Sequence, residues 1–158
     1  MANSQSMCTS FMGELLTATH NFGAAPIRAA TTADTFKGAL YLASATVDAA
    51  TTVYSSSGEV TGSGYSPGGI NVTNANPPVA TNASATAGVA YWTPSASLVY
   101  TSVTLTTAFD AVLIYNSSQS NKAVSVHTFG SQTITSGTFT LTMPANTTTT
   151  ALLRLATT

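Results

Sequence analysis

The sequence predicts a mainly β protein: an antiparallel β-sandwich, jelly-roll-like, with one short N-terminal helix. Two observations lead to this fold class. From Asp34 onward, apolar residues either alternate with polar ones or form short runs bounded by Gly, Pro, Asn and Ser, as in strands joined by turns. No helical pattern separates these runs, so the βαβ units of a parallel sheet are not indicated. A jelly roll is one of several sandwich or barrel topologies that fit.

The N-terminal segment divides into an arm and a helix. We expect residues 1–9 to be an extended arm and residues 10–158 to form one domain, which a chain of 158 residues can fill with a single core. Within that domain, an apolar stripe at helical spacing predicts a helix over 10–22, capped by Ser10 and ended by Gly23. A helix this short must pack on something, either its own β core or a neighbouring subunit.

Eight segments after the helix have the pattern of strands. The run 109–115 is the most apolar and predicts the centre of a sheet. In 138–143, three apolar residues alternate with three threonines, which predicts a strand with one buried face. The eight expected strands are 35–43, 70–73, 89–92, 98–105, 109–115, 123–129, 138–143 and 151–155.

Two loops stand out between these strands. Residues 58–69 contain five glycines and predict a compact, turn-rich connection. A phosphate-binding loop is not indicated there, because no Gly-Lys-Ser/Thr sequence follows and the next element is a strand. Residues 74–88 are polar and small and contain Pro77-Pro78, which predicts an exposed excursion.

Charge is scarce in this chain. Only 6% of residues are Asp, Glu, Lys or Arg, the net charge is −1, and the four cationic residues are scattered along the sequence. Phosphate backbones and anionic membranes are bound by clustered Lys and Arg, so we expect neither nucleic acid nor a membrane as a partner. A charge-poor surface rich in hydroxyls is either simply solvated or lies against neighbours in an assembly. We favour the second interpretation and expect a homo-oligomer.

We expect no signal peptide at the N-terminus. It lacks the charged and apolar regions of a signal peptide, and no apolar run is long enough to span a bilayer. We therefore expect synthesis in a cytoplasm, where chance explains the Asn-x-Ser/Thr sequons better than glycosylation does. Cys8 is the one cysteine, so no internal disulfide is possible.

The sequence offers no catalytic, cofactor-binding or metal-binding residues. His20 and His127 lie far apart, without the Cys, His or Asp spacing of a metal site. A Gly-x-Ser-x-Gly sequence occurs at 64–68, but a strand follows it, whereas a nucleophile elbow leads from a strand into a helix. Nothing in the spacing of the five acidic residues brings two of them together for glycoside hydrolysis, although Asp110 and Lys122 could pair across a hairpin. We therefore expect a protein that is not an enzyme and binds no cofactor.

A set of short motifs resembles a family of small virion structural proteins of tailed bacteriophages. The motifs lie at 10–22, 34–37, 39–41, 58–69, 111–116, 121–124 and 129–130. The resemblance implies a virion component, of which a capsid decoration or cement protein bound to the major capsid protein is the foremost candidate. Such a protein reaches its neighbours through arms and loops. The expected inter-subunit contacts are Ser4, Met7, Cys8, Pro77, Pro78 and Val79.

A tail, head–tail connector or fibre component that binds a receptor is the alternative function. Clustered aromatic side chains on an exposed face would favour it, because Tyr and Trp anchor many binding sites. The same side chains in the core would favour the decoration protein. The residues that decide between the two are Tyr91, Trp92 and Tyr100.

Overall fold

The chain is mainly β, and its strands form antiparallel sheets, as the sequence predicts. The computed structural model describes residues 3–8, 11, 15, 19–20, 22, 33–73, 76, 78–80 and 89–156. The first sheet has the order β1-β7-β6-β2-β3: Ser6–Met7, Lys122–Leu141, Leu98–Asn116, Phe36–Leu42 and Ile70–Asn71. The second sheet has the order β4-β5-β8: Val79–Ala80, Val89–Trp92 and Leu153–Ala156.

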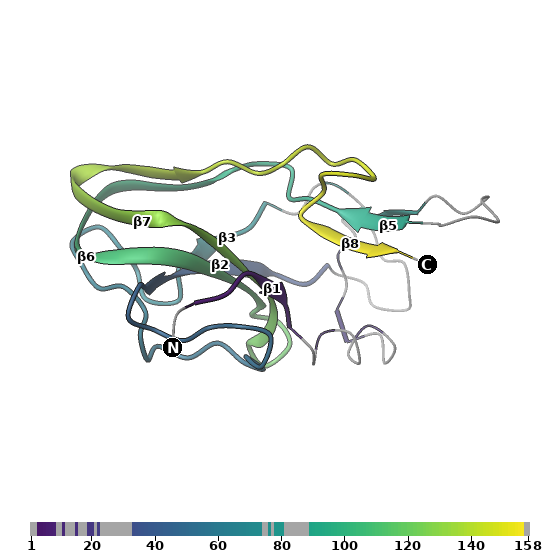
Figure 1. Ribbon diagram of the computed structural model, residues 1–158, viewed down its shortest axis with the longest axis horizontal. Coiled ribbons are helices and arrows are strands. Elements are labelled where there is room, and N and C mark those ends of the chain that lie inside the picture. Colours follow the sequence, from purple (N-terminus) through teal and green to yellow (C-terminus); the bar gives the residue numbers. More distant parts are fainter. Residues whose placement is uncertain are drawn as a thin grey trace.

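A long hairpin of β6 and β7 dominates the structure. Four strands were expected over this stretch, but the structure joins them into two strands of 19 and 20 residues. The pairing register shifts at several points, and Ser102 and Ser136 have positive φ near one of the shifts. Bulges of this kind bend a strand without ending it. The hairpin accordingly curves back over itself at the end of the molecule far from β5 and β8 (Figure 1).

The core lies where the folded hairpin meets β2. In β6 the residues Ala111 to Tyr115 are all buried, as the most apolar run in the sequence predicts. The Tyr100 hydroxyl donates a 2.8 Å hydrogen bond to the carbonyl of Gly38, which joins the first half of β6 to β2. Gly38 permits this approach, since a Cβ there would lie 2.7 Å from the Leu98 side chain.

Aromatic rings fill the space inside the bend of the hairpin. The Phe139 ring lies 5.1 Å from those of both Phe109 and Phe129. These residues come from both halves of the hairpin, so the contacts hold its two halves together. Buried aromatic pairs of this geometry stabilise a core by about 0.5–1.5 kcal/mol beyond their burial.

The helix expected over 10–22 falls largely outside the described residues, which include only 11, 15, 19–20 and 22 of that range. The stripe residues that are described pack on the chain's own core. Phe11 and Phe22 are buried, and the Phe22 ring lies 4.5 Å from that of Phe36 and 4.8 Å from that of Trp92. The sequence allowed this stripe to pack either on the chain's own β core or on a neighbouring subunit, and these contacts are with the chain's own core.

The glycine-rich connection 58–69 is turn-rich, and it lies against β6. Ser63 forms an isolated bridge with Thr104. Gly64 has a φ of +78°, and a Cβ at this position would lie 2.2 Å from the Ser102 carbonyl. Only glycine allows the two backbones to come this close. The connection leads into β3, which pairs with the start of β2.

Candidate functional site

Glu59 is a buried carboxylate in the glycine-rich connection 58–69. Its side chain is only 6% exposed. Oε1 accepts hydrogen bonds from the Tyr65 hydroxyl at 2.6 Å and the Gly68 amide at 2.8 Å, and Oε2 accepts one from the Tyr54 hydroxyl at 2.6 Å. A buried charge is tolerated when its oxygens are satisfied in this way. Two of the bonds join Glu59 to other parts of the connection and the third joins it to Tyr54, so Glu59 holds this region together.

Five tyrosines from separate segments surround this carboxylate, and we call them the tyrosine cluster: Tyr41, Tyr54, Tyr65, Tyr100 and Tyr115. Burial raises the pKa of every hydroxyl in the cluster, and the Glu59 charge raises it further. For Tyr41 the pKa rises to about 12. The cluster is therefore fully protonated near neutral pH and acts as a set of hydrogen-bond donors.

The individual tyrosines connect Glu59 to the sheet. The Tyr65 hydroxyl also accepts a 3.0 Å hydrogen bond from the Leu40 amide in β2. The Tyr115 hydroxyl donates to the Gly68 carbonyl at 2.8 Å, and its ring stacks on that of Tyr54 at 4.6 Å. In the sequence, Glu59 is one of five acidic residues, and no motif distinguishes it from the other four. Because the five rings come from distant parts of the chain, no local spacing could have revealed the cluster.

His127 and Ser125 form the one Ser–His hydrogen bond recorded among the described residues. The Ser125 hydroxyl and His127 Nε2 are 2.9 Å apart. Burial lowers the pKa of His127 to about 4, so the imidazole is neutral near neutral pH. Ser125 is buried and no substrate could approach its hydroxyl in this conformation. The pair is best described as a satisfied polar contact of the core.

Asp110 does not face Lys122, contrary to the pairing that we expected. The tight turn after β6 places Asn116 opposite Lys122, and Asp110 lies six residues further along the strand. Strands rise about 3.3 Å per residue, so the two charges are roughly 20 Å apart. The Asp110 carboxylate instead accepts a hydrogen bond from the Asn3 side chain.

His20 belongs to a buried network at the turn between β6 and β7. The Asn116 amide nitrogen donates to Asp34 Oδ2 at 2.8 Å and to His20 Nδ1 at 3.0 Å. The Gln119 amide donates to Asp34 Oδ1 at 3.1 Å. Because an amide nitrogen only donates, His20 carries its proton on Nε2. These bonds join the start of β2 to the hairpin turn.

Over the described ranges, no three His, Cys, Asp or Glu side chains gather closely enough to hold a metal ion. In the same ranges, no helix has the length and apolarity needed to cross a membrane.

Of the first three expected contact residues, Met7 lies in the edge strand β1, and Ser4 and Cys8 lie on either side of that strand. The Ser4 amide donates to the Val47 carbonyl, and the Cys8 amide donates to the Val124 carbonyl. Ser4 is exposed and Met7 is half-buried, but Cys8 is fully buried. Residues 3–8 are thus docked on the domain and do not extend from it as the arm we expected. Cys8 cannot touch a neighbouring subunit in this conformation.

The other three contact residues belong to the predicted excursion. Pro78 and Val79 are exposed, and Val79 lies in β4, at an edge of the small sheet. Pro77 lies outside the described residues. The sheet of β4, β5 and β8 extends at the opposite end of the molecule from the bend of the long hairpin (Figure 1).

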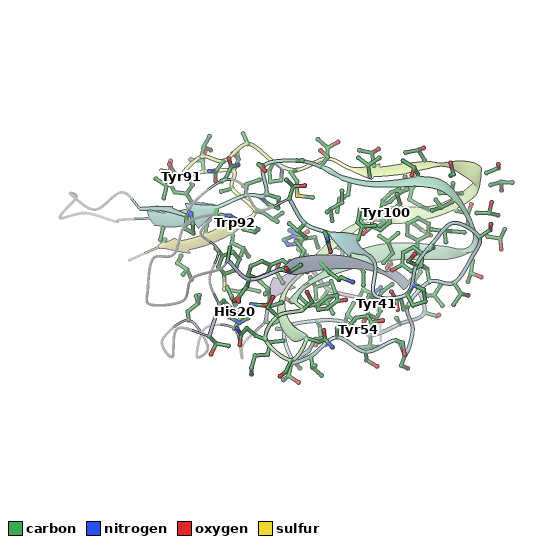
Figure 2. All side chains as sticks on the ribbon, turned by 180° about the vertical axis from the view of Figure 1, so that it is seen from behind. His20, Tyr41, Tyr54, Tyr91, Trp92 and Tyr100 are labelled. Atoms are coloured by element: carbon green, nitrogen blue, oxygen red, sulfur yellow. The ribbon has the colours of Figure 1, made fainter. Side chains whose placement is uncertain are left out.

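The three aromatic residues that distinguish the two functional hypotheses are largely inside the protein. Trp92 is 3% exposed, Tyr100 is 2% exposed, and Tyr91 is half-buried. Tyr91 and Trp92 lie at one end of the molecule, while Tyr100 lies toward the other (Figure 2). The three therefore form no common exposed aromatic face.

One half of the long hairpin carries a surface of hydroxyl groups, which we call the hydroxyl surface. Neither 93–109 nor 123–153 contains an Asp, Glu, Lys or Arg. The half that bends back exposes serines and threonines from both strands. The exposed residues that define this surface are Val99, Thr101, Ser102, Thr106, Thr107, Ser131, Gln132, Thr133, Thr135, Ser136, Thr138 and Thr140.

Comparison with known proteins gives no match: no family model, no curated protein and no solved structure is similar to this chain.

Proposed function

We propose that this chain is a non-enzymatic structural protein of a bacteriophage particle, a decoration or cement protein that binds and stabilises the shell of major capsid protein. The observation that carries the proposal is the hydroxyl surface. Permanent protein interfaces are depleted of charge at their centres, and this surface has no charged side chain at all. The sequence motifs that resemble phage virion proteins are the reason for proposing a bacteriophage particle as the assembly.

The hydrogen bonds made by the titratable side chains support a structural role for this protein. Glu59 binds two tyrosine hydroxyls and an amide, Asp34 binds Asn116 and Gln119, and His127 binds Ser125. Glu59 and Asp34 each fix one segment of the fold to another, while the His127 bond lies within β7. A protein that clamps a shell benefits from such rigidity, since an ordered surface loses less entropy on binding.

The alternative, a receptor-binding tail or fibre component, receives less support. It predicts an exposed cluster of Tyr91, Trp92 and Tyr100, whereas Trp92 and Tyr100 are buried. We therefore keep the head of the particle as the proposed location. Assembly as a homo-oligomer remains part of the proposal, and sedimentation of the purified protein tests it.

We further propose that the fold is a β-sandwich of jelly-roll type. Support comes from the bond between Tyr100 and Gly38, which links the bent half of the hairpin to the sheet beneath it. The packing of Phe139 on Phe109 supports the same arrangement. An experimental structure would test it, and a single-layered sheet with one open face would contradict it.

The copy number of the protein in purified virions tests the location. We expect a ratio to the major capsid protein near one, or a simple fraction such as about one-third, because decoration proteins occupy equivalent sites over the whole shell. Quantitative gel densitometry measures the ratio. A ratio of a few per cent would move the protein to the tail or portal vertex, and absence from virions would refute the virion assignment.

A charge placed on the hydroxyl surface tests the docking face. Thr140→Lys should weaken binding to undecorated capsids at least tenfold, because the lysine would be buried without a partner. Ser56→Lys is the matched control, since Ser56 is exposed outside that surface and should tolerate the same charge. Wild-type binding should also change little with salt concentration. Equal binding by both variants would show that the capsid contacts another face.

A further inference from the structure

A pocket of about 450 Å³ lies beside the tyrosine cluster, in the half of the molecule that holds Tyr41 and Tyr54 (Figure 2). Its lining consists of five serine and threonine residues, three aliphatic residues, Gly58 and the buried Tyr41. No Asp, Glu, Lys, Arg or His contributes to the lining. The volume falls within the range of small-molecule sites, roughly 300–1,000 Å³.

The walls of this pocket are held in place by hydrogen bonds outside it. On one side, the Val47 amide donates to the Asn3 side chain at 3.1 Å, and the Val47 carbonyl accepts from the Ser4 amide at 3.2 Å. The Asp48 amide donates to the Thr51 hydroxyl at 3.0 Å. These bonds fix the turn over 44–51, so this wall exists before any ligand arrives.

The opposite wall is attached to the hairpin. Val53 forms a bridge with Lys122, and the Tyr54 amide donates to the Asn121 carbonyl at 2.9 Å. At the base of the pocket, the Tyr41 hydroxyl donates to the Ser55 carbonyl. A preformed site loses little conformational entropy when it binds a small ligand.

We propose that this pocket binds a neutral sugar. The hydroxyls of Ser44, Thr51 and Ser57 can exchange hydrogen bonds with sugar hydroxyls, while Val47 and Val53 offer apolar area to the C–H faces of a pyranose ring. Val53 is 46% exposed, and a bound ring would cover it.

Other ligand classes fit the lining less well. A charged ligand would lose hydration and find no countercharge among the lining side chains. A purely apolar ligand would cover the Ser44 and Ser57 hydroxyls without offering them a hydrogen bond. The proposal concerns a different face from the hydroxyl surface and does not depend on capsid binding.

Titration of the ¹⁵N-labelled protein with neutral sugars tests the proposal by NMR. The probes are glucose, galactose, mannose and N-acetylglucosamine, with glucosamine and glucuronate as charged counterparts. We expect at least one neutral sugar to shift amide signals within 41–58 in a saturable manner, with a Kd on the order of millimolar. The charged counterparts should bind at least threefold more weakly.

Two matched variants separate binding in the pocket from general effects. Val53→Ser removes apolar area from the wall and should weaken binding about threefold or more. Val99→Ser makes the same change at a valine that is 43% exposed on the hairpin, away from the lining, and should leave binding unchanged. The proposal is overturned if no neutral sugar produces saturable shifts, if the shifts lie outside 41–58, if Val53→Ser binds as wild type does, or if charged sugars bind equally well.

Discussion

The Tyr65 hydroxyl donates a 2.6 Å hydrogen bond to Glu59 Oε1 and accepts a 3.0 Å bond from the Leu40 amide. One side chain therefore links the buried carboxylate to β2. These two hydrogen bonds explain how a connection with five glycines remains ordered against the sheet. It also makes the stability of the fold sensitive to changes at either end of the bond.

Removing the charge of Glu59 should destabilise the protein. In Glu59→Gln, an amide group replaces one of the two oxygens that accept hydrogen bonds from tyrosine hydroxyls. We expect the free energy of unfolding to fall by about 1–3 kcal/mol, the cost of leaving a buried donor unpaired. Urea denaturation followed by circular dichroism measures the change, and an unfolding midpoint equal to that of wild type would contradict it.

Tyr65→Phe should have a comparable effect, because both the Leu40 amide and Glu59 lose a partner. We expect a loss of about 1–3 kcal/mol in the same denaturation experiment. Tyr91→Phe is the matched control, since Tyr91 is half-buried and lies outside the tyrosine cluster. Equal losses in the two variants would mean that the hydroxyl of Tyr65 has no special role.

Alkaline pH should unfold the protein over a defined window. The pKa of Tyr41 is raised from 10.0 to about 12, and the other four tyrosines of the cluster are raised as well. Below pH 10 this stabilisation is fully present, since both the folded and the unfolded chain keep their protons. As pH rises from 10 toward 12, the unfolded chain ionises first and stability is lost.

Thermal unfolding at several pH values, with tyrosinate absorbance, measures this alkaline window. We expect the melting temperature to be flat up to pH 10 and to fall steeply above it. Tyrosine ionisation should coincide with unfolding. If all six tyrosines ionise near pH 10 while the fold persists, the cluster is not buried in solution.

The loss of folding stability at acid pH should depend on His127. Burial lowers the pKa of His127 from 6.5 to about 4, so the stabilisation is present above pH 6.5 and is lost as pH falls through 4. His127→Gln removes the titrating group and keeps a polar partner for Ser125. We expect this variant to lose less stability than wild type between pH 6.5 and 4. Identical acid profiles would exclude His127 as the cause.

Gly38→Ala should be strongly destabilising. A Cβ at this position would lie 2.7 Å from Leu98 Cδ1, inside a packed core. Overpacking of this kind costs about 1–3 kcal/mol, measurable by urea denaturation. Gly130→Ala is the matched control, because nothing lies within 4 Å of its added Cβ. Similar losses for both variants would indicate that Gly38 matters only through backbone freedom.

Local patterns predicted much of the secondary structure but less of the strand lengths. The expected strand 35–43 corresponds to β2, and 89–92 coincides with β5. The sequence could not reveal that 98–105 and 109–115 form one strand, because the bulges that join them depend on pairing with β7. It also placed Asp110 opposite Lys122, since hairpin register is set by a turn whose geometry was unknown.

The sequence alone determined that this protein is mainly β, that its surface carries few charges, and that residues 111–115 are buried, because these properties depend on composition and short-range periodicity. Only the tertiary structure decided that five separate tyrosines surround Glu59, that Trp92 and Tyr100 face inward, and that residues 6–8 dock on β7. These contacts join residues far apart in the chain, and the free energy that selects them comes from packing the whole core at once.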